Sequence, residues 1–284
     1  LRAFAFRHLV QSRQRMMEYS ITNPEDERVA DFIGLSNHKL RQLREKDGGD
    51  MAPYFIGEGI IVINRALTVE HKLLTLIVSE KFDHSQITTI PKGCNIFRCS
   101  PSVLEAITGR PNLKDPIGTF LRPPQSTFEE LTRKANLIVL TESVQNPTNM
   151  GMVMRNAAAF GVDAVLFDPQ SCDPLYRRAV RVSMGQVFSV PHTQVPSVTE
   201  AIDALKEKGF LTIALTPDPK SQNLGVVLNE TSRPIVLIIG SEGFGLSTNS
   251  LTAADCTAKI PMHNNVDSLN VATSLAIALY AVQN

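Results

Sequence analysis

Two kinds of apolar spacing alternate along the second half of the chain. Four segments carry continuous apolar runs, which are typical of parallel strands buried on both faces. They are residues 136–143, 162–167, 210–216 and 234–240. A loop at 144–151 leads into residues 152–160, which, like 198–208, space their apolar side chains as helices do. Gly161 follows the first of these helices as a C′ residue would. Alternating strands and helices predict an α/β domain whose parallel sheet is covered on both faces.

The final segment, residues 260–284, begins as a polar loop and ends as an apolar helix. Asp267 or Ser268 is expected to cap this helix. Together with Asn270 they crowd its first turn, where free backbone N–H groups and the helix dipole favour an electron-rich ligand. A glycine-rich turn at 240–247 follows the strand at 234–240, so we expect the two turns to face one ligand. The apolar spacing of the helix is carried by Leu269, Val271, Leu275, Ile277, Ala278 and Leu279.

The first half of the chain predicts a second, smaller α/β domain. Residues 31–44 suit a short amphipathic helix that ends at the Asp47-Gly48-Gly49 turn. Apolar segments at 54–68, 73–82 and 94–109 supply the strands and further helices. Pro123, Pro124 and the polar residues after them predict a linker. We therefore assign residues 1–122 to an N-terminal domain, 123–135 to the linker and 136–284 to a C-terminal domain.

Residues 1–17 are rich in arginine and contain no acidic residue. Two interpretations stay open. The segment is either a basic first helix or the remnant of an organelle-targeting sequence, which tends to be Arg-rich and poor in acids. The first interpretation favours a cytoplasmic protein, and the second favours a mitochondrial or plastid matrix. The arginines are Arg2, Arg7, Arg13 and Arg15.

Length, composition and charge narrow the class of protein. A chain of 284 residues suggests two domains at about 150 residues each. Its 43% hydrophobic and 20% charged residues are typical of a soluble globular protein, and no apolar run approaches the roughly 20 residues of a membrane span. The net charge is zero, which argues against a generally basic nucleic-acid binder. Residues 1–135 nevertheless carry +3 and residues 136–284 carry −3, so the first half is better suited to contact phosphates.

The cysteines indicate neither a zinc site nor a disulfide framework. Cys94, Cys99, Cys172 and Cys256 lack the close C-x-x-C pairing that either would show. We expect reduced thiols in an intracellular protein.

Three segments, in this order, resemble the signature motifs of the SpoU/TrmH family. They are residues 146–161, 240–247 and 260–280. The resemblance implies an S-adenosylmethionine-dependent RNA 2′-O-ribose methyltransferase with a C-terminal trefoil knot of the SPOUT type, paired as a homodimer through the knotted domain. Glu58-Gly59 and the apolar run after it resemble the L30e-like, RNA-substrate-binding domain that precedes many such enzymes. The stretch at 109–124 departs from that arrangement.

The same resemblance implies roles for individual residues. The implied catalytic residues are Arg155, Asn149, Glu242, Ser268 and Asn270. The implied S-adenosylmethionine-binding residues are Gly240, Gly243, Leu215, Ile260, Met262 and Leu269, and no metal is implied. We expect Ile260, Pro261, Met262 and Leu269 to form the apolar slot for the adenine. His263 is interpreted as a solvated side chain of a variable loop.

The catalytic role of Arg155 is implied only by the resemblance, because its position alone would also suit an ordinary surface arginine. An arginine side chain is a poor base, so we expect it to bind a substrate phosphate and polarise the 2′-hydroxyl. Proton abstraction by Arg155 itself, or by a substrate phosphate oxygen, stays open. Asn149 is expected to orient Arg155 or the ribose, and Glu242 to pair with Asn149 or Arg155.

Two other functions fit the sequence less well than methyl transfer to ribose. A Rossmann nucleotide enzyme would carry its glycine fingerprint after the first strand, whereas this chain has its glycine turn after a late one. A noncatalytic RNA-binding or ribosome-assembly protein would be expected to have lost part of the implied site. The additional N-terminal domain favours ribosomal RNA over transfer RNA as the substrate.

Overall fold

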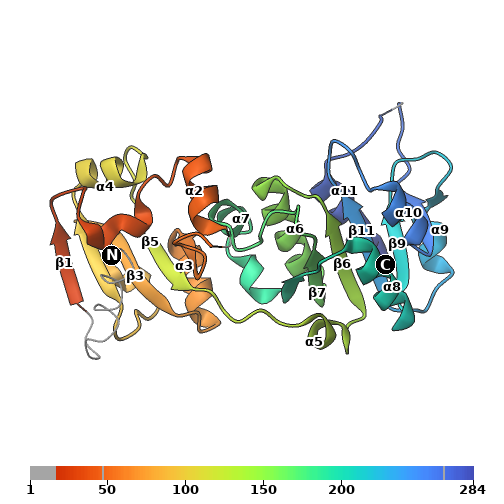
Figure 1. Ribbon diagram of the computed structural model, residues 1–284, viewed down its shortest axis with the longest axis horizontal. Helices are drawn as coiled ribbons and strands as arrows, with labels where there is room; N and C mark the ends of the chain where they lie inside the picture. The colour runs from red at the N-terminus through yellow and green to blue at the C-terminus, as the bar shows by residue number, and fades with distance from the viewer. Residues whose placement is uncertain (1–16, 47, 265) are drawn as a thin grey trace. The chain divides into compact units, whose positions relative to one another are not determined.

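The computed structural model describes residues 17–46, 48–264 and 266–284 (Figure 1). The chain forms two compact units, and the boundary between them falls between Pro123 and Pro124. The basic segment predicted at residues 1–17 lies outside the described residues except for Met17, which begins a strand. Among the described residues, no helix is both long and apolar enough to cross a membrane.

In the described residues, the first unit contains a five-stranded mixed sheet in the order β1-β4-β3-β5-β2. Strand β5 runs antiparallel to both of its neighbours, and the other pairs are parallel. The strands are β1 (Met17–Ile21), β2 (Tyr54–Glu58), β3 (Leu73–Ser79), β4 (Asn95–Cys99) and β5 (Ile117–Leu121). The helices are η1 (Glu27–Phe32), α2 (His38–Glu45), α3 (Ile60–Thr68), η2 (His84–Gln86) and α4 (Pro101–Thr108). This confirms a mixed α/β unit, while its likeness to the L30e fold stays a prediction.

The helix predicted at 31–44 is wrong in its limits and in its buried face. Gly34 has a φ of +69° and the side chain of Asn37 caps a new helix, so the segment is split between η1 and α2. The buried residues of α2 are Arg41 and Glu45, whereas Leu43 is exposed. The packing of α2 therefore depends on polar groups rather than on an apolar stripe.

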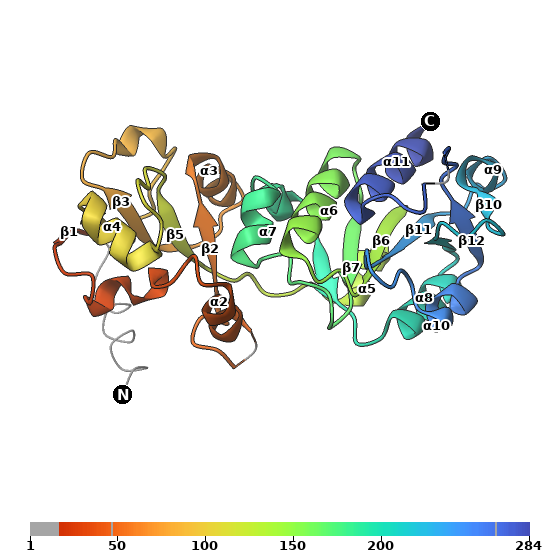
Figure 2. The same ribbon diagram turned by 90° about the horizontal axis from the view of Figure 1, so that it is seen from above.

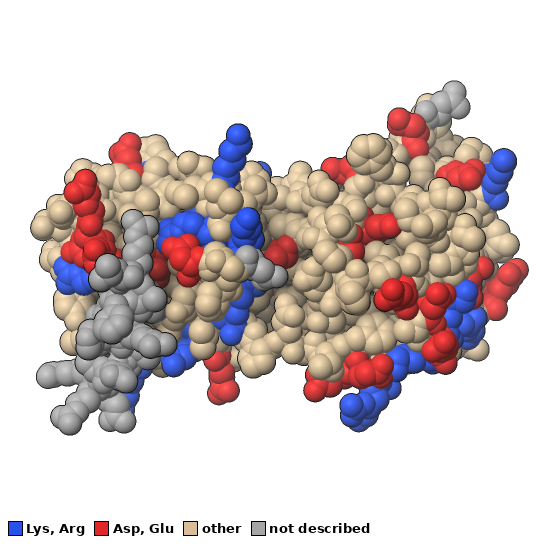
Figure 3. Space-filling model, in the orientation of Figure 1, with Lys and Arg blue, Asp and Glu red and all other residues tan. Residues whose placement is uncertain are grey.

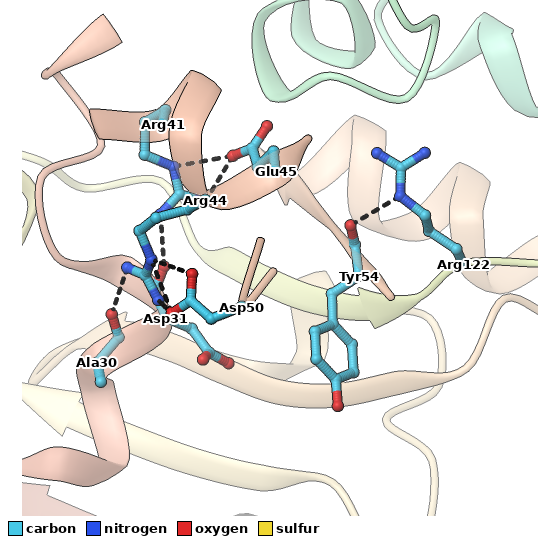
Figure 4. Close-up of polar contacts among 8 residues, drawn as sticks. All are labelled: Ala30, Asp31, Arg41, Arg44, Glu45, Asp50, Tyr54 and Arg122. Carbon is cyan, nitrogen blue, oxygen red and sulfur yellow. Dashed lines mark hydrogen bonds and ion pairs between the residues drawn. The ribbon is translucent and has the colours of Figure 1, made fainter. Parts of the chain in front are cut away.

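Figure 4 shows how these polar groups are satisfied. The Arg41 guanidinium, which is 1% exposed, forms an ion pair with Glu45 at 2.6 Å and donates to the carbonyl of Asp31 at 2.9 Å. Arg44 forms an ion pair with Asp50 at 2.9 Å. Burial raises the pKa of the Asp31 carboxyl above its usual range. These contacts join η1, α2 and the turn after α2.

The stretch at 109–124 also has a structural role in the first unit. It supplies strand β5, which lies between β3 and β2. Arg110 forms an ion pair with Glu58, a buried acid at the end of β2. Arg122 donates from Nε to the carbonyl of Tyr54 at 3.0 Å (Figure 4).

In the described residues of the second unit, seven strands form one parallel sheet in the order β10-β12-β9-β11-β6-β7-β8. The strands are β6 (Leu137–Glu142), β7 (Ala164–Phe167), β8 (His192–Gln194), β9 (Leu211–Leu215), β10 (Gln222–Asn223), β11 (Ile235–Gly240) and β12 (Cys256–Lys259). The predicted parallel sheet is confirmed. The four apolar runs form β9, β11, β6 and β7, which are consecutive neighbours in the sheet. The trefoil knot stays a prediction.

Helices cover both faces of this sheet, as predicted, with α6 and α11 on one face and α8 and α10 on the other (Figure 2). The helices are α5 (Phe128–Thr132), α6 (Pro147–Ala159), α7 (Arg177–Val182), η3 (Gln186–Ser189), α8 (Val198–Glu207), α9 (Leu224–Asn229), α10 (Thr248–Ala253) and α11 (Val271–Gln283). The segment assigned to a linker contains α5, whose Phe128 and Leu131 pack on the apolar core of the second unit.

Candidate functional site

A pocket of about 390 Å³ opens at the carboxyl ends of β6 and β11, within the second unit. Ligands of open α/β sheets bind at this edge, outside the carboxyl ends of the strands. Three walls come from the loop after β6, the first turn of α6 and the glycine turn after β11, and Val271 of α11 contributes to the lining. The lining residues include Glu142, Ser143, Gln145, Asn146, Asn149, Glu242 and Phe244.

Asn270 joins two of these walls. Its Nδ2 donates to Asn149 Oδ1 at 3.1 Å and also to the carboxylate of Glu242. Its Oδ1 accepts from the backbone N–H groups of Ala272 at 3.0 Å and Thr273 at 3.2 Å, so Asn270 is the N-cap of α11. The expected cap, Asp267 or Ser268, is therefore wrong. One amide both begins the last helix and connects the three segments that resemble family motifs.

Asn149 lies inside helix α6 rather than in the predicted loop. The helix begins earlier than expected because Asn146 caps it and Pro147 occupies its first turn, where a missing N–H has no effect on the helix. Asn149 is only 6% exposed. Farther along α6, Asn156 Nδ2 donates to the carbonyl of Ala272 at 2.8 Å. Helices α6 and α11 are thus held together at two points, although 116 or more residues separate each pair of partners.

The glycine turn is shaped by contacts with itself. A Cβ on Gly240 would lie 2.3 Å from the backbone carbon of Gly245, so a side chain at this position cannot be accommodated. Gly245 has a φ of +67° and its N–H donates to the carbonyl of Ser241 at 3.0 Å, which closes the turn. By contrast, a Cβ on Gly243 would meet no atom within 4 Å. Gly240 is therefore required by the turn itself, and Gly243 faces open space at the pocket.

Glu142 is a site residue that the sequence analysis missed. It ends strand β6, and its carboxylate accepts from the N–H of Ser247 at 3.0 Å and from the hydroxyl of Ser250 at 2.9 Å. These bonds hold the far end of the glycine turn and the start of α10. The only signal in the sequence was an acidic residue at the end of a buried strand. None of the three motifs includes Glu142.

The loop after β6 has a strained backbone. Ser143 has a φ of +56°, a conformation that residues other than glycine rarely adopt. The buried Asp168 accepts from the N–H of Ser143 at 2.9 Å, and the hydroxyl of Ser171 accepts from the N–H of Val144 at 2.9 Å. Two residues from the loop after β7 thus fix the conformation that places Gln145 and Asn146 at the pocket.

Of the residues implied for S-adenosylmethionine, Gly243 lines the pocket, and Leu215, Gly240 and Ile260 lie at the same edge of the sheet. Leu215 and Gly240 are the last residues of the adjacent strands β9 and β11, and Ile260 directly follows β12 on the other side of β9. Both Met262 and Leu269, like these three, are only partly buried. Exposed apolar side chains beside the free backbone groups of strand ends suit the flat, apolar face and polar edge of an adenine. The residues therefore fit the cofactor.

Three implied catalytic residues, Arg155, Ser268 and Asn270, are not part of the pocket lining, although Asn270 is bonded to Asn149 and Glu242, which are. Arg155 is exposed, and it forms no hydrogen bond or ion pair with any residue that the structure describes. It follows Asn149 by six residues, which turns it roughly 120° around α6. Ser268 is also exposed, and its N–H donates to the side chain of Asp267 at 3.1 Å. Asn149, Glu242 and Asn270 are thus brought together, while Arg155 and Ser268 are not.

The described residues contain no group of three or more His, Cys, Asp or Glu side chains that could hold a metal ion. His263 is exposed and lies outside the pocket lining. No disulfide joins the cysteines in the part of the chain that the structure describes, and burial raises the pKa of both Cys94 and Cys99 to about 12.

Comparison with known proteins places this geometry among RNA methyltransferases. A model of the SpoU rRNA Methylase family matches residues 136–280. An uncharacterized tRNA/rRNA methyltransferase of Mycobacterium tuberculosis is 32% identical over 262 residues, which are 92% of this chain and 90% of the relative. The crystal structure of an AdoMet-bound rRNA methyltransferase from Sinorhizobium meliloti is 25% identical, with a TM-score of 0.78 over 94% of this chain and 97% of that one. A crystal structure of an RNA 2′-O ribose methyltransferase is 26% identical, with a TM-score of 0.73 over 94% of this chain and 98% of that one.

Proposed function

The chain belongs to the SpoU rRNA methylase family, and from this premise we propose that it transfers a methyl group from S-adenosylmethionine to a ribose 2′-hydroxyl of RNA. The observation that carries the proposal is the position of Asn270, which joins Asn149 and Glu242 at a pocket beside the apolar strand ends. The likeness to a solved RNA 2′-O ribose methyltransferase over almost the whole chain supports the ribose as the acceptor.

The cofactor supplies a methyl group already activated on a sulfonium. Leu215, Ile260, Met262 and Leu269 would hold its adenine, together with the backbone at Gly240. Because the methyl carbon is activated by the cofactor itself, the protein has to align the hydroxyl, ease the loss of its proton and exclude water.

Asn149 and Glu242 act on the ribose. The carboxylate of Glu242 is exposed at the pocket and can accept a hydrogen bond from a ribose hydroxyl, while Asn270 fixes its orientation. Asn149 is held by the same amide, so the two groups keep a constant separation as the substrate enters. Such positioning of an acceptor hydroxyl is a principal contribution that a protein can make to methyl transfer.

Arg155 and the second copy of the chain belong to the same proposal. Arg155 lies outside the pocket of its own chain, so we assign it to the pocket of a partner protomer in a two-fold homodimer. There the guanidinium binds a substrate phosphate and polarises the 2′-hydroxyl. Exposed Ile277 and Tyr280 on α11 supply apolar surface for the contact between copies.

Ribosomal RNA is the substrate that we propose, with the first unit as its binding platform. The charge distribution gives limited support. On the face in Figure 3, basic and acidic side chains are interspersed rather than gathered into one basic patch. The +3 charge of residues 1–135 includes four arginines that lie outside the described residues. RNA recognition by this unit therefore depends on local contacts more than on a broad field.

The proposal is tested by nucleoside analysis of the product. Purified protein is incubated with isotope-labelled S-adenosylmethionine and either unmodified ribosomal RNA or unmodified transfer RNA, and digested nucleosides are separated by mass spectrometry. The label should appear in 2′-O-methylnucleosides of ribosomal RNA. Label in base-methylated nucleosides, or in neither RNA, would reject the ribose proposal, and label in transfer RNA alone would reject only the substrate.

Arg155→Ala tests the role of this arginine in the same assay. Because Arg155 acts on the hydroxyl and not on the adenine, the variant should lose methyl transfer while its calorimetric affinity for S-adenosylmethionine stays within about twofold of the wild type. Weakened cofactor binding would show that Arg155 serves the cofactor instead.

A further inference from the structure

Phe244 has no place in the function derived so far. It stands in the glycine turn between Gly243 and Gly245, and its side chain is 98% exposed. The other phenylalanines of the second unit are buried or half-buried. A phenyl ring fully in water gives up the free energy of burial. Among the exposed large apolar residues in the described part of the chain, Phe244 is the most exposed, and Tyr280 follows at 62%.

Hydrogen bonds fix the backbone of the turn that carries this ring. The N–H of Gly245 donates to the carbonyl of Ser241, and the N–H of Phe244 approaches the hydroxyl of Ser241 at 3.4 Å. Glu142 fixes the far end of the turn through Ser247. Phe244 lines the pocket together with Glu242, the residue whose carboxylate we assign to the ribose.

The opposite wall presents side-chain amides. Gln145 and Asn146 line the pocket on the strained loop that Asp168 and Ser171 hold. Asn146 Oδ1 accepts from the N–H of Thr148 at 2.8 Å, which leaves its Nδ2 as a donor. Neither Asn146 Nδ2 nor the Gln145 amide bonds to another residue in the part of the chain that the structure describes. An amide edge and an exposed aromatic residue in the lining of one pocket are a combination that recognises an unstacked nucleobase.

We infer that this pocket binds the base of the nucleotide to be methylated, with Phe244 stacked on its face and Gln145 and Asn146 bonded to its edge. The inference rests on the proposed function, because it places the base next to the ribose that Asn149 and Glu242 align. A volume of about 390 Å³ lies within the range of ~300–1,000 Å³ typical of sites for small organic groups. Specificity for one nucleotide then comes from the amide edge, since stacking tolerates every base.

A contact between two copies of the chain explains the ring less well. A stable dimer interface buries about 800 Å² on each partner around an apolar centre. The exposed neighbours of Phe244 in the turn are Glu242 and two glycines, so the ring is an isolated apolar group. The exposed apolar residues Ile277 and Tyr280 lie on α11 instead.

The test uses a single-stranded RNA pentamer with 2-aminopurine, a fluorescent base, at its centre. Stacking on Phe244 quenches this fluorescence. Phe244→Ala should lose the quenching and bind the pentamer about 5-fold to about 100-fold more weakly, whereas Phe244→Tyr keeps the ring and should retain both. Val226→Ala, which truncates an exposed apolar residue on α9, is the matched control and should behave as the wild type.

Edge recognition has its own variant. Asn146→Asp preserves the cap of α6, because aspartate accepts the same N–H, but it replaces the Nδ2 donor with an acceptor. Among pentamers that differ only in the central base, this variant should change the order of affinities, while Phe244→Ala should weaken all of them alike. An unchanged order would remove Asn146 from base recognition.

These binding assays do not require methyl transfer, so their outcome is separable from that of the proposed function. Equal affinity and quenching in wild type and Phe244→Ala, or no quenching by the wild type, would overturn the inference even if the wild type methylates RNA. If Phe244→Ala instead weakens self-association in sedimentation equilibrium and leaves RNA affinity unchanged, the ring belongs to a contact between copies.

Discussion

Asn270 performs two tasks through the two ends of one amide, and two substitutions separate them. Oδ1 caps α11 and Nδ2 donates to Asn149 and Glu242. Asn270→Ala removes both functions. Asn270→Asp keeps an oxygen that can cap the helix but offers no donor to Asn149, and it places a second carboxylate beside Glu242.

The expected magnitudes follow from these contacts. Loss of the cap in Asn270→Ala should destabilise the start of α11 by about 1 kcal/mol. Asn149 is buried, so losing its donor adds about 1 kcal/mol in either variant. Glu242 is exposed and water replaces its lost partner, while repulsion from Asp at position 270 amounts to about 1 kcal/mol in high dielectric. Asn270→Asp is therefore expected to keep the helix start and misplace the groups that align the ribose.

Hydrogen exchange and methyl-transfer kinetics measure the two effects separately. In Asn270→Ala, the amides of Ala272 and Thr273 should exchange about 5-fold faster than in the wild type, which corresponds to the lost cap. In Asn270→Asp they should remain protected, while kcat/KM for methyl transfer falls about 10-fold or more. Full methyl transfer by Asn270→Asp would refute the role of the Nδ2 donor, and unchanged exchange in Asn270→Ala would refute the role of the cap.

Three further outcomes follow from the structure. Equilibrium sedimentation should give a dimer at micromolar concentration. If each pocket uses both chains, mixing Arg155→Ala with Asn270→Asp protomers should restore part of the activity. An active monomer would contradict this. A truncated protein that begins at Ser126 should bind S-adenosylmethionine normally, lose RNA affinity and show a flatter salt dependence of RNA binding. Unchanged RNA affinity would instead place RNA recognition on the second unit. The candidates there are Arg177, Arg178 and Arg181 of α7. Burial raises the pKa of Asp31, so the folded state holds that proton more tightly than the unfolded state and the carboxyl lowers stability as pH rises from about 4. The difference in urea midpoint between Asp31→Asn and wild type should therefore shift in favour of the variant between pH 4 and pH 7, and a difference independent of pH would contradict the assignment.

The sequence was sufficient for the elements with strong apolar patterns. Continuous runs predicted β6, β9 and β11, because strands buried on both faces need apolar residues throughout. Strand β12 was missed because CTAK contains only one fully buried residue, and β10 has only two residues. Their places depend on pairing with neighbours, which periodicity does not encode.

The site was predictable where the motifs resemble a family, and less so where geometry decides. Three polar residues before α11 could each have capped it, and only the backbone path selects Asn270 over Asp267 and Ser268. Glu142 could be singled out only as an acid at the end of a buried strand, because its partners are a backbone N–H and a hydroxyl more than 100 residues away. The buried Arg41–Glu45 pair inverted an amphipathic pattern that appeared ordinary.

The two contacts between α6 and α11 have a consequence for the order in which the protein is made. Asn149 and Asn156 leave the ribosome well over 100 residues before Asn270 and Ala272, which bind them. Contacts of such long range form late and slowly, because a large loop must close before they contribute any stability. A nascent chain that already contains β6, the glycine turn and most of the sheet therefore still lacks Asn270, whose side-chain amide joins Asn149 to Glu242. The joined pair at the pocket therefore forms only after Asn270 has been synthesised and has folded back onto α6, so a chain that stops before residue 270 lacks it.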